Sequence, residues 1–592
     1  MRQAIESGCC YDVTQSERGL TWRWRCDDEH EIANISKQGG VDNLTARLLA
    51  GRGVPADDVD NFLQPKLRDF LPNPSTLKDM DKAAEHIVSA MQSGKRITVF
   101  ADYDVDGGSS AAQLIRWARS FQVDFSLYVP DRVKEGYGPS AEAFRQLKQE
   151  GSELIITVDC GAAAHDALEV AADIGLPVVV IDHHMMHGDL PPSTALVNPN
   201  RDDDSSGLGH LAAAGVTFVL LVALNREARK HGLGDGPNLL EFLGLSALGT
   251  ICDVVPLTGL NRAIVSQGLK VLSSTNHVGV KALSDVAGAE PPYTTYHGGF
   301  ILGPRINAGG RIGKASMGAE LLSTENTQLA YAHAAELDRV NQDRKQLQSQ
   351  MLEEALIKAA KLPEDHAITL VSMDGWHPGV IGIVAGRLKD RFERPAIVIG
   401  VNEEGLGKGS GRSMYGVNLG EAITQAREAG LLISGGGHPM AGGLTVDSKN
   451  IEALNDFLNE TLRSQVQNAR KTMSLKIDTA IKPSAATPQL IETMKKVGPY
   501  GAGHPQPRFI LPDMMITYAE RVRGGHVRCS FADDDGQRIS GICFSADETG
   551  LDAILLAPNP PRVHVAGRIK EDKWKDRVRI DLIVEDLAVT RQ

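Results

Sequence analysis

The sequence predicts an α/β protein of several domains, with its functional site on a doubly wound, mostly parallel sheet. Three observations predict this fold class. Four apolar runs are separated by amphipathic segments, as in successive βαβ units. Residues 325–361 lack Gly and Pro and are rich in helix-forming residues, which predicts one long helix. After Arg470, strand-like runs alternate with turn residues, which is typical of a small OB-like β-barrel. The four apolar runs are 97–101, 123–129, 154–158 and 177–181.

The chain divides into five expected segments. The first is mixed and mostly helical, and it ends in a helix-like stretch at 80–91. The second holds the parallel sheet, and the third is the long connecting helix. The fourth is a second α/β lobe, which begins with the apolar run 367–371 and contains two glycine-rich stretches. The fifth is the OB-like barrel. The expected bounds are 1–90, 91–324, 325–361, 362–468 and 469–592.

Length, charge and cysteine content limit the class of protein. At 592 residues the chain is too long for one hydrophobic core. The formal charge of −13 argues against a protein that coats duplex nucleic acid, although residues 562–579 are locally basic. Seven unevenly spaced cysteines do not suggest a disulfide framework. No apolar run reaches the length of a membrane span, and the first residues do not resemble a secretory signal. We therefore expect a cytoplasmic protein that does not bind a membrane.

The most informative segment is 101–110, where Asp102, Asp104 and Asp106 directly follow an apolar run. If the strand continued past Phe100, period-2 alternation would put all three carboxylates on one side. Three anions in that position repel each other unless a positive group lies among them. A divalent cation is the simplest candidate, so the segment predicts a metal-dependent active site.

Three further motifs repeat this arrangement of an apolar run followed by acidic or imidazole side chains. They are Asp159 after 154–158, the trio Asp182, His183 and His184 after 178–181, and Asp253 after 247–252. Ligands of open α/β sheets bind beyond the carboxyl ends of the strands, and at least three of the motifs fall there. Any single motif would be an ordinary helix cap, turn or surface loop, but four together predict a metal site. A mixed Asp/His set suits Mn²⁺, and Mg²⁺ is less disposed to nitrogen ligands. We expect the neighbouring Cys160 and Cys252 to be packing residues.

The motif order DYDVDG, TVDCG, DHH and CDVVP resembles the DHH phosphoesterase superfamily. The finer resemblance is to the RecJ single-stranded-DNA exonucleases, and it covers nearly the whole chain. It implies that the second segment is a DHH domain and the fourth a DHHA1 domain that binds nucleic acid. The sequence departs from the family pattern at His504, where Asn is usual, at Gly309, and in the C-terminal barrel. The other similar blocks are GYGPS (136–140), GPRINAGGR (303–311), GWHPGVIGIVAGRL (375–388), KGSGRS (408–413), GGGHPMAGG (435–443) and GPYGAGHPQPRF (498–509).

The resemblance implies a role for each matching residue. Asp159 and Asp253 are the expected shared carboxylates, Asp102 and Asp182 would orient the cluster, and His184 would contact the scissile phosphate. From the residues alone, Arg387 could instead cap a helix end, and the glycines of 435–443 could form a tight turn. The expected metal ligands are Asp104, Asp106, Asp159, His183 and Asp253. The expected DNA contacts are Arg132, Tyr137, Arg305, Arg387, Ser410, Arg412, Gly436, Gly437 and His438, of which Arg132, Ser410 and Arg412 would hold the 5′ phosphate.

The function that follows is a 5′→3′ exonuclease of DNA recombination and repair. It would hydrolyse single-stranded DNA to 5′ mononucleotides with two Mn²⁺ or Mg²⁺ ions, as a monomer, alongside a helicase and a single-strand-binding protein. One alternative is a phosphodiesterase for short oligoribonucleotides or cyclic dinucleotides, but the additional N-terminal and barrel segments favour long strands. Another is an inactive relative that only binds single strands, but the ligand set is complete.

Overall fold

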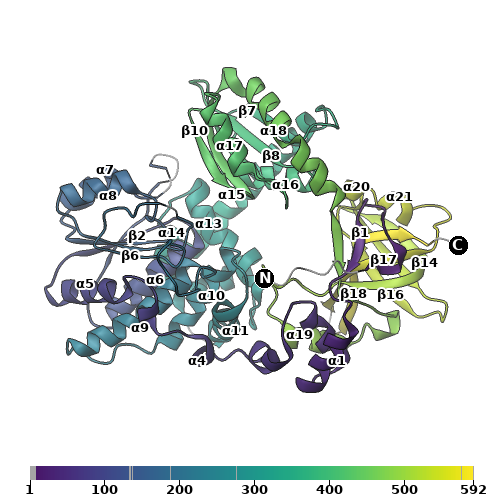
Figure 1. Cartoon of the computed structure of the whole chain (residues 1–592), viewed down its shortest axis with the longest axis horizontal. Helices are drawn as coiled ribbons and strands as arrows, with labels where there is room; N and C mark the ends of the chain where they lie inside the picture. Colours follow the sequence, from purple (N-terminus) through teal and green to yellow (C-terminus); the bar gives the residue numbers. More distant parts are fainter. Residues whose placement is uncertain are drawn as a thin grey trace. The chain divides into compact units, whose positions relative to one another are not determined.

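The computed structural model describes residues 8–131, 135–136, 138–186, 188–274, 277–574 and 577–590. The chain forms two compact units, each built from more than one stretch of sequence (Figure 1). Unit 1 comprises Met1–Gln64, Gln350–Gly498 and Gln506–Gln592. Unit 2 comprises Pro65–Ser349 and Pro499–Pro505. No helix in these described ranges has both the length and the apolar character needed to cross a bilayer.

Unit 2 contains a parallel five-stranded sheet in the order β3-β2-β4-β5-β6, which confirms the predicted fold class. The four predicted strands are present, and β6 is an additional edge strand. The order places the first strand, β2, beside the third, β4, so the winding direction reverses between them, and ligands of such sheets bind at this switch point. The bounds are β2 Ile97–Ala101, β3 Ser126–Tyr128, β4 Leu154–Val158, β5 Val178–Ile181 and β6 Ala195–Val197.

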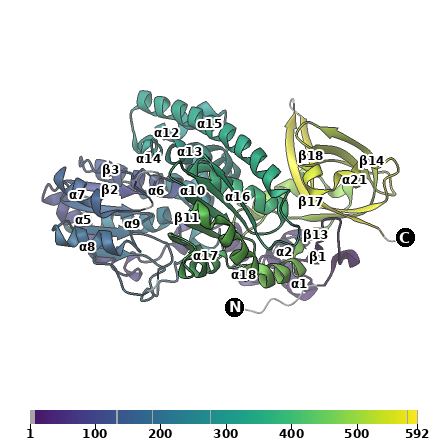
Figure 2. The same cartoon turned by 90° about the horizontal axis from the view of Figure 1, so that it is seen from above.

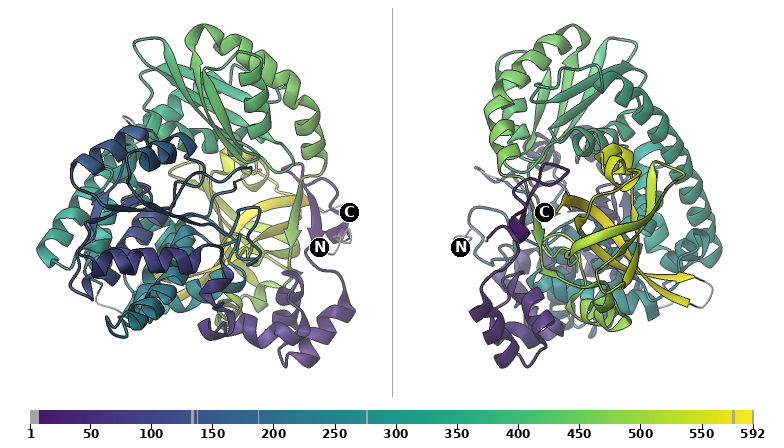
Figure 3. Two further views of the ribbon diagram at one scale, coloured as in Figure 1. Left: turned by 60° about the vertical axis from the view of Figure 1, so that its left-hand side comes forward. Right: turned by 90° about the vertical axis from the view of Figure 1, so that its right-hand side faces the viewer.

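Helices cover both faces of this sheet, as expected for a doubly wound fold (Figures 1 and 3). The strands are apolar on both sides because each face is buried. Residues such as Val99 and Ile156 pack against α5, α6 and α9, whereas Phe100 and Ile155 pack against α7 and α8. The bounds are α5 Met80–Gln92, α6 Val105–Arg119, α7 Ala141–Gln149, α8 His165–Asp173 and α9 Ala213–Lys230.

A helical layer completes unit 2. Its central helix, α10, packs between α6, α9 and α11. A π-helix, η5 (His297–Leu302), leads directly into α13 and also contacts α10. Pro499–Pro505 packs here although it lies in the sequence segment expected to form the barrel: Leu257 N donates to Ala502 O at 2.9 Å. The helices are α10 Leu243–Cys252, α11 Gly259–Ser274, α12 Val278–Ala287, α13 Gly303–Ile312 and α14 Met317–Ser323.

The predicted long helix is present as α15, Thr327–Ala359, with 33 residues. It begins in unit 2 and ends in unit 1.

Unit 1 contains a second α/β lobe whose five-stranded sheet has the order β10-β11-β9-β8-β7. Only β7 and β8 are parallel. α17 (Leu419–Glu428) and α18 (Ile451–Lys471) bury one face of the sheet, while α16 (Pro378–Phe392) packs on β8 and β9 (Figures 1 and 2). The strands are β7 Thr369–Asp374, β8 Ala396–Val401, β9 Leu406–Arg412, β10 Ser434–His438 and β11 Ala441–Asp447.

The C-terminal part of unit 1 is a closed five-stranded barrel, as predicted (Figure 3). Antiparallel pairing of β14 with β17 closes it. The sequence suggested short strands, but β14, β17 and β18 have 14, 12 and 13 residues. Register shifts in these pairings bend the long strands around the barrel, and the one between Leu511 and Met514 contains Pro512 and Asp513, which resemble a strand end. The strands are β14 Phe509–Val522, β15 His526–Ala532, β16 Arg538–Cys543, β17 Val563–Trp574 and β18 Arg577–Val589.

The N-terminal segment of unit 1 is attached to the start of the barrel region. β1 (Thr21–Trp24) pairs in parallel with β12 (Ser474–Ile477). Trp22 is fully buried, and its indole N–H donates to the buried carboxylate of Asp586 at 2.8 Å. A buried indole N–H needs such an acceptor, so this hydrogen bond fixes the segment against β18.

Candidate metal centre

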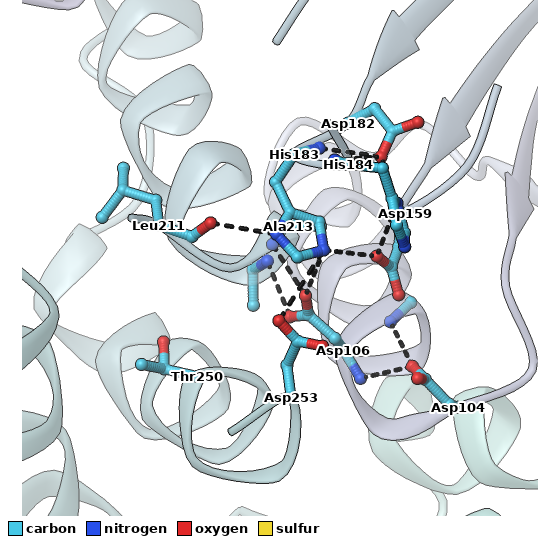
Figure 4. Close-up of polar contacts among 12 residues, drawn as sticks. Asp104, Asp106, Asp159, Asp182, His183, His184, Leu211, Ala213, Thr250 and Asp253 are labelled. Atoms are coloured by element: carbon cyan, nitrogen blue, oxygen red, sulfur yellow. Dashed lines mark hydrogen bonds and ion pairs between the residues drawn. The ribbon is translucent and has the colours of Figure 1, made fainter. Parts of the chain in front are cut away.

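The acidic and histidine motifs of unit 2 converge at the carboxyl edge of the parallel sheet, at its switch point (Figure 4). Asp102 follows β2, Asp159 follows β4, and Asp182 and His183 follow β5. The remaining carboxylates come from helix ends: Asp104 and Asp106 lie at the start of α6, and Asp253 is the residue after α10. The run 247–252 before Asp253 is therefore helical, so only three of the four motifs are strand ends.

The structure corrects the reason why Asp102, Asp104 and Asp106 lie together. β2 ends at Ala101, and the strand alternation that was considered for the three carboxylates does not occur. Asp104 is the N-cap of α6, and its Oδ1 accepts hydrogen bonds from the backbone N–H groups of Asp106 (2.8 Å) and Gly107 (3.1 Å). The carboxylates are thus presented by a turn and by the first turn of a helix, whose positive end tolerates them.

Asp106 is almost completely buried and is held by another helix N-terminus. Its Oδ2 accepts from Ala213 N at 2.7 Å and its Oδ1 from Ala214 N at 2.9 Å, in the first turn of α9. Gly249 of α10 makes room for this carboxylate, because a Cβ there would lie 2.6 Å from Asp106 Oδ1. Burial, followed by the charge of Asp253, raises the pKa of Asp106 to about 7. Without a cation, the ionised form of this carboxylate is therefore disfavoured.

His183 turns one ring nitrogen toward three carboxylates. Its Nδ1 donates to the carbonyl oxygen of Leu211 at 3.0 Å, so in the neutral ring Nε2 carries a lone pair. That Nε2 is buried without a hydrogen-bond partner. A lone pair facing carboxylate oxygens is repulsive, and a cation between them would make it attractive. The distances from Nε2 are 3.2 Å to Asp159 Oδ1, 3.7 Å to Asp253 Oδ2 and 3.9 Å to Asp106 Oδ2.

Three overlapping sets of side chains could hold a metal ion. Within each set, one ligand atom per residue lies within 4.8 Å of the others. Asp159 belongs to two sets, as a shared carboxylate would, whereas Asp253 belongs to one. Asp102, which was expected to orient the cluster, itself offers an oxygen at ligand distance. The sets are Asp106, His183 and Asp253; Asp102, Asp104 and Asp159; and Asp159, His183 and His184.

Asp182 belongs to none of these sets and instead positions both histidines. Its Oδ1 accepts from His183 N (2.7 Å) and from His184 Nδ1 (2.8 Å), and its Oδ2 accepts from Ala162 N (2.9 Å). Burial alone would raise the pKa of Asp182, but the hydrogen bond and charge of His184 lower it to about 2. Burial alone would lower the pKa of His184, but Asp182 raises it to about 9. The two side chains therefore form an ion pair.

Residues far from the cluster in sequence support it, and sequence reasoning missed them. Asn307 Oδ1 accepts from Val105 N at 3.0 Å, across 202 positions of sequence. Gly310 leaves space for the ring of Tyr103. Both lie in the block GPRINAGGR, in which Arg305 was the one residue expected to have a functional role. Asp159 has a left-handed backbone (φ 60°), a strained conformation for a residue other than Gly, and such strain often marks functional sites.

Two of the expected phosphate contacts lie together in unit 1. Ser410 and Arg412 alternate along one face of β9, and Arg412 Nη1 donates to Ser410 Oγ at 3.2 Å and to Gly411 O at 2.8 Å. Gly382 of α16 lies against both side chains, since a Cβ there would be 2.9 Å from Ser410 Oγ. Arg132 and Tyr137 lie outside the described residues.

The glycines of β10 and β11 differ between the two faces of the sheet. Gly436 pairs with Gly443, which pairs with Ser410, so these three residues share one face. A Cβ on Gly436 would meet no atom within 4 Å, and one on Gly443 would lie 4.0 Å from the nearest atom. By contrast, a Cβ on Gly435, on the opposite face, would lie 2.9 Å from Ile423. Packing thus explains Gly435, but it does not explain Gly436 or Gly443.

The other expected DNA contacts have different surroundings. Gly437 (φ 153°) faces Gly442 at the end of the β10–β11 hairpin, and His438 is exposed beside it. Arg387 is exposed on α16, with no ion pair or hydrogen bond to another described side chain. Arg305 is already engaged: its Nε lies 2.8 Å from Asp338 Oδ1 and its Nη1 donates to Ile301 O at 2.7 Å. A phosphate at Arg305 would have to compete with the Asp338 carboxylate.

Three family models match the chain. They are the DHH family N-terminal domain over residues 96–250, the DHHA1 domain over 365–464 and the RecJ OB domain over 477–586.

Similar proteins match over most of the chain. The single-stranded-DNA-specific exonuclease RecJ of Bacillus subtilis is 34% identical over 96% of this chain and 71% of its own length. The protein of the same name from Salmonella typhimurium is 36% identical over 92% of this chain and 95% of its own length.

Solved structures agree with this relationship. A crystal structure of RecJ from Thermus thermophilus with Mn²⁺ matches with a TM-score of 0.77 and 29% identity, over 95% of this chain and 78% of that one. The Mg²⁺ complex of RecJ from the same organism matches with a TM-score of 0.73 and 28% identity, over 95% and 77%.

Proposed function

Because the chain belongs to the RecJ family of single-stranded-DNA-specific exonucleases, we propose that it is a metal-dependent exonuclease that degrades single-stranded DNA from the 5′ end. The observation that carries this proposal is the group of overlapping ligand sets at the switch point of the parallel sheet. The products would be 5′ mononucleotides, and the setting would be DNA recombination and repair.

The donor set fits two Mn²⁺ or Mg²⁺ ions. Asp106, His183 and Asp253 would hold one ion (Figure 4). Asp102, Asp104 and Asp159 would hold the other. The orphaned, buried Nε2 of His183 is the evidence for fit, because a cation is the group that would reconcile it with the carboxylates around it. When bound, such ions activate water and neutralise the charge that develops on phosphate.

His184 would bind the phosphate that is cleaved. Its ring is kept charged by Asp182, which accepts from Nδ1, so Nε2–H remains as a donor for a phosphate oxygen. The His184 side chain is about 40% exposed, whereas the Asp182 side chain behind it is 2% exposed. Asp182 thus holds the donor in one orientation, and His184 can reach a substrate.

The 5′ phosphate would bind in unit 1, on the face of the second sheet that carries Ser410 and Arg412. Arginine offers a planar fork that matches phosphate oxygens. The absence of side chains at Gly436 and Gly443 leaves room for a phosphate on the same face as Ser410 and Arg412. A requirement for this end group would set the 5′→3′ direction.

The central test uses one long single strand labelled at the 5′ or the 3′ end, its duplex and a dinucleotide, each with Mn²⁺ and with Mg²⁺. We expect mononucleotides from the 5′ end of the single strand and little cleavage of the duplex. Asp159→Ala should abolish hydrolysis, with a loss of at least about 10³-fold, because it removes a carboxylate that belongs to two of the three ligand sets. Asp166→Ala, which removes an exposed carboxylate at the start of α8, is the matched control. Cleavage confined to the dinucleotide, or full activity of Asp159→Ala, would refute the proposal.

The phosphate site has its own test, which exploits the two kinds of glycine. Gly436→Ala should weaken binding of 5′-phosphorylated strands about 10-fold without loss of stability, because its Cβ points into open space. Gly435→Ala should lower stability instead, because its Cβ meets Ile423. Arg412→Ala should weaken the binding of 5′-phosphorylated strands more than the binding of 5′-hydroxyl strands. Equal losses on both kinds of end would contradict this assignment.

A further inference from the structure

Two aromatic rings of unit 2 are exposed side by side at the start of η5 and within it. Tyr296 is 60% exposed and Phe300 is 73% exposed. Their ring centroids lie 5.5 Å apart with an interplanar angle of 22°, so the rings stack. An exposed aromatic pair does not contribute to a core, and contiguous exposed apolar surface of this kind marks an interaction site.

The segment that carries the rings is fixed against the candidate metal centre. Cys252, the residue before Asp253, donates its S–H to Gly298 O at 3.5 Å. A Cβ on Gly303 would lie 2.6 Å from Cys252 Sγ, so only Gly allows this close approach. The inner side of η5 therefore packs on the last turn of α10, and its outer side carries Tyr296 and Phe300.

The backbone conformation of η5 also indicates a functional role for this segment. His297–Leu302 is a π-helix, a form that is rare and is common at functional sites. The neighbouring residues are anchored as well: Thr295 Oγ1 donates to Tyr500 O at 2.8 Å, within the same unit. The rings are thus presented on a backbone that is held at both of its ends.

We propose that the Tyr296–Phe300 pair is a stacking platform for bases of the single-stranded DNA substrate. The proposal rests on the proposed exonuclease function and names residues that distinguish a single strand from a duplex. A ring face accepts any unpaired base, because every base has a π-face, whereas the bases of a duplex are stacked on each other. Through Cys252, η5 packs on the helix that ends beside Asp253. In this proposal a strand engaged at the metals continues over the two rings.

The test measures binding in the presence of a chelator, so that no strand is cleaved. Each ring removed in Tyr296→Ala and Phe300→Ala should raise Kd for a long single strand by about 5- to 150-fold, the range for loss of one base–aromatic stack. Tyr296→Trp and Phe300→Trp should bind like the wild type, whereas the two Leu variants should bind like the Ala variants. Tyr331→Ala is the control, because it removes an exposed ring of α15 in the same unit.

A scan with one abasic site per strand locates the stack. The wild type should lose affinity at one or two adjacent abasic positions, and the Tyr296→Ala, Phe300→Ala double variant should be insensitive there. The proposal would be overturned if the double variant bound the single strand with unchanged affinity. It would also be overturned if the Leu variants bound like the wild type. A concentration-dependent dimer of the wild type that is absent in the double variant would overturn it too, since the rings would then be a self-association surface. If the wild type fails to cleave any single strand, the proposed function itself is refuted.

Discussion

At the scale of residues, Asp182 is the side chain on which the geometry of the centre depends most. One carboxylate accepts from the backbone of His183, the ring of His184 and the backbone of Ala162. Removal of such an outer partner typically lowers metal affinity or activity 10- to 100-fold.

Asp182→Asn should therefore lower both kcat and Mn²⁺ affinity by about 10- to 100-fold, because an amide cannot accept all of these hydrogen bonds. Calorimetric Mn²⁺ titration and single-strand hydrolysis would measure the two effects. Asp173→Asn, at the exposed end of α8, is the matched control. Wild-type values for Asp182→Asn would show that the histidines are held by other contacts.

Single residues also show what a sequence can reveal about this site. Asp159 and His183 were predictable, because an apolar run followed by a charged residue marks the end of a parallel strand. Gly249 and Asn307 were not, because their role is a contact with residues more than 100 positions away. Alternation along a strand correctly suggested that the three aspartates of 101–110 act together, but it gave the wrong geometry, because the N-cap at Asp104 ends the extended conformation.

At the scale of elements, α12 depends on an unusual cap. His277 is its N-cap, and Nδ1 accepts from Val280 N at 3.3 Å, which requires an unprotonated nitrogen. Burial, followed by the charge of Arg116, lowers the pKa of His277 to about 3. Between that value and the ordinary histidine pKa of about 6.5, the unfolded chain binds the additional proton. Stability from this cap is complete above about pH 6.5 and is lost as the pH falls toward 3.

His277→Asn should flatten this part of the stability profile, because Asn caps helices well and does not titrate. The wild type should lose up to about 1.4 kcal/mol per pH unit relative to the variant on acidification from pH 6.5. Urea unfolding midpoints of both proteins at several pH values between 4.5 and 7.5 would measure this difference in stability. Parallel profiles of the two proteins would contradict the role of the cap.

The helices and strands differ in how well the sequence predicts their type and length. α15 was predictable because 33 helical residues without Gly or Pro carry a strong local signal. The length of β14 was not, because a register shift lets the strand continue through Pro512 and Asp513. The π-helix at His297–Leu302 has no local signal, since its contacts with Ile251 and Cys252 determine its conformation.

At the scale of the whole molecule, the order of residues in the sequence does not follow the two compact units. Pro499–Pro505 lies between barrel segments in sequence but packs in unit 2, where a Cβ on Gly501 would lie 2.7 Å from Leu257. His504, at a position where the family usually has Asn, is buried there and stacks on Tyr500 at 5.1 Å. That departure from the family pattern therefore concerns the packing of unit 2 rather than the barrel.

All residues of the candidate metal centre belong to unit 2, and this gives a prediction about stability. Without metal, buried carboxylates such as Asp106 and Asp159 repel each other, and burial raises the pKa of each. Mn²⁺ at 100 times its Kd should add about 2.7 kcal/mol to the stability of unit 2, which corresponds to a rise of about 4 °C in its Tm. Scanning calorimetry with Mn²⁺ and with chelator should show one transition that shifts and one that does not.

Asp253→Asn makes the sign of this effect testable. It removes one repelling charge, so the metal-free variant should unfold at a higher temperature than the metal-free wild type, while losing most of the Mn²⁺ shift. Asp166→Asn removes an exposed charge of the same unit. It should change neither the unfolding temperature without metal nor the shift caused by Mn²⁺. If Mn²⁺ raised both transitions equally, the ions would bind outside the cluster. If Asp253→Asn responded to Mn²⁺ like the wild type, Asp253 would not be a ligand, since loss of one carboxylate from a three-residue set must weaken binding.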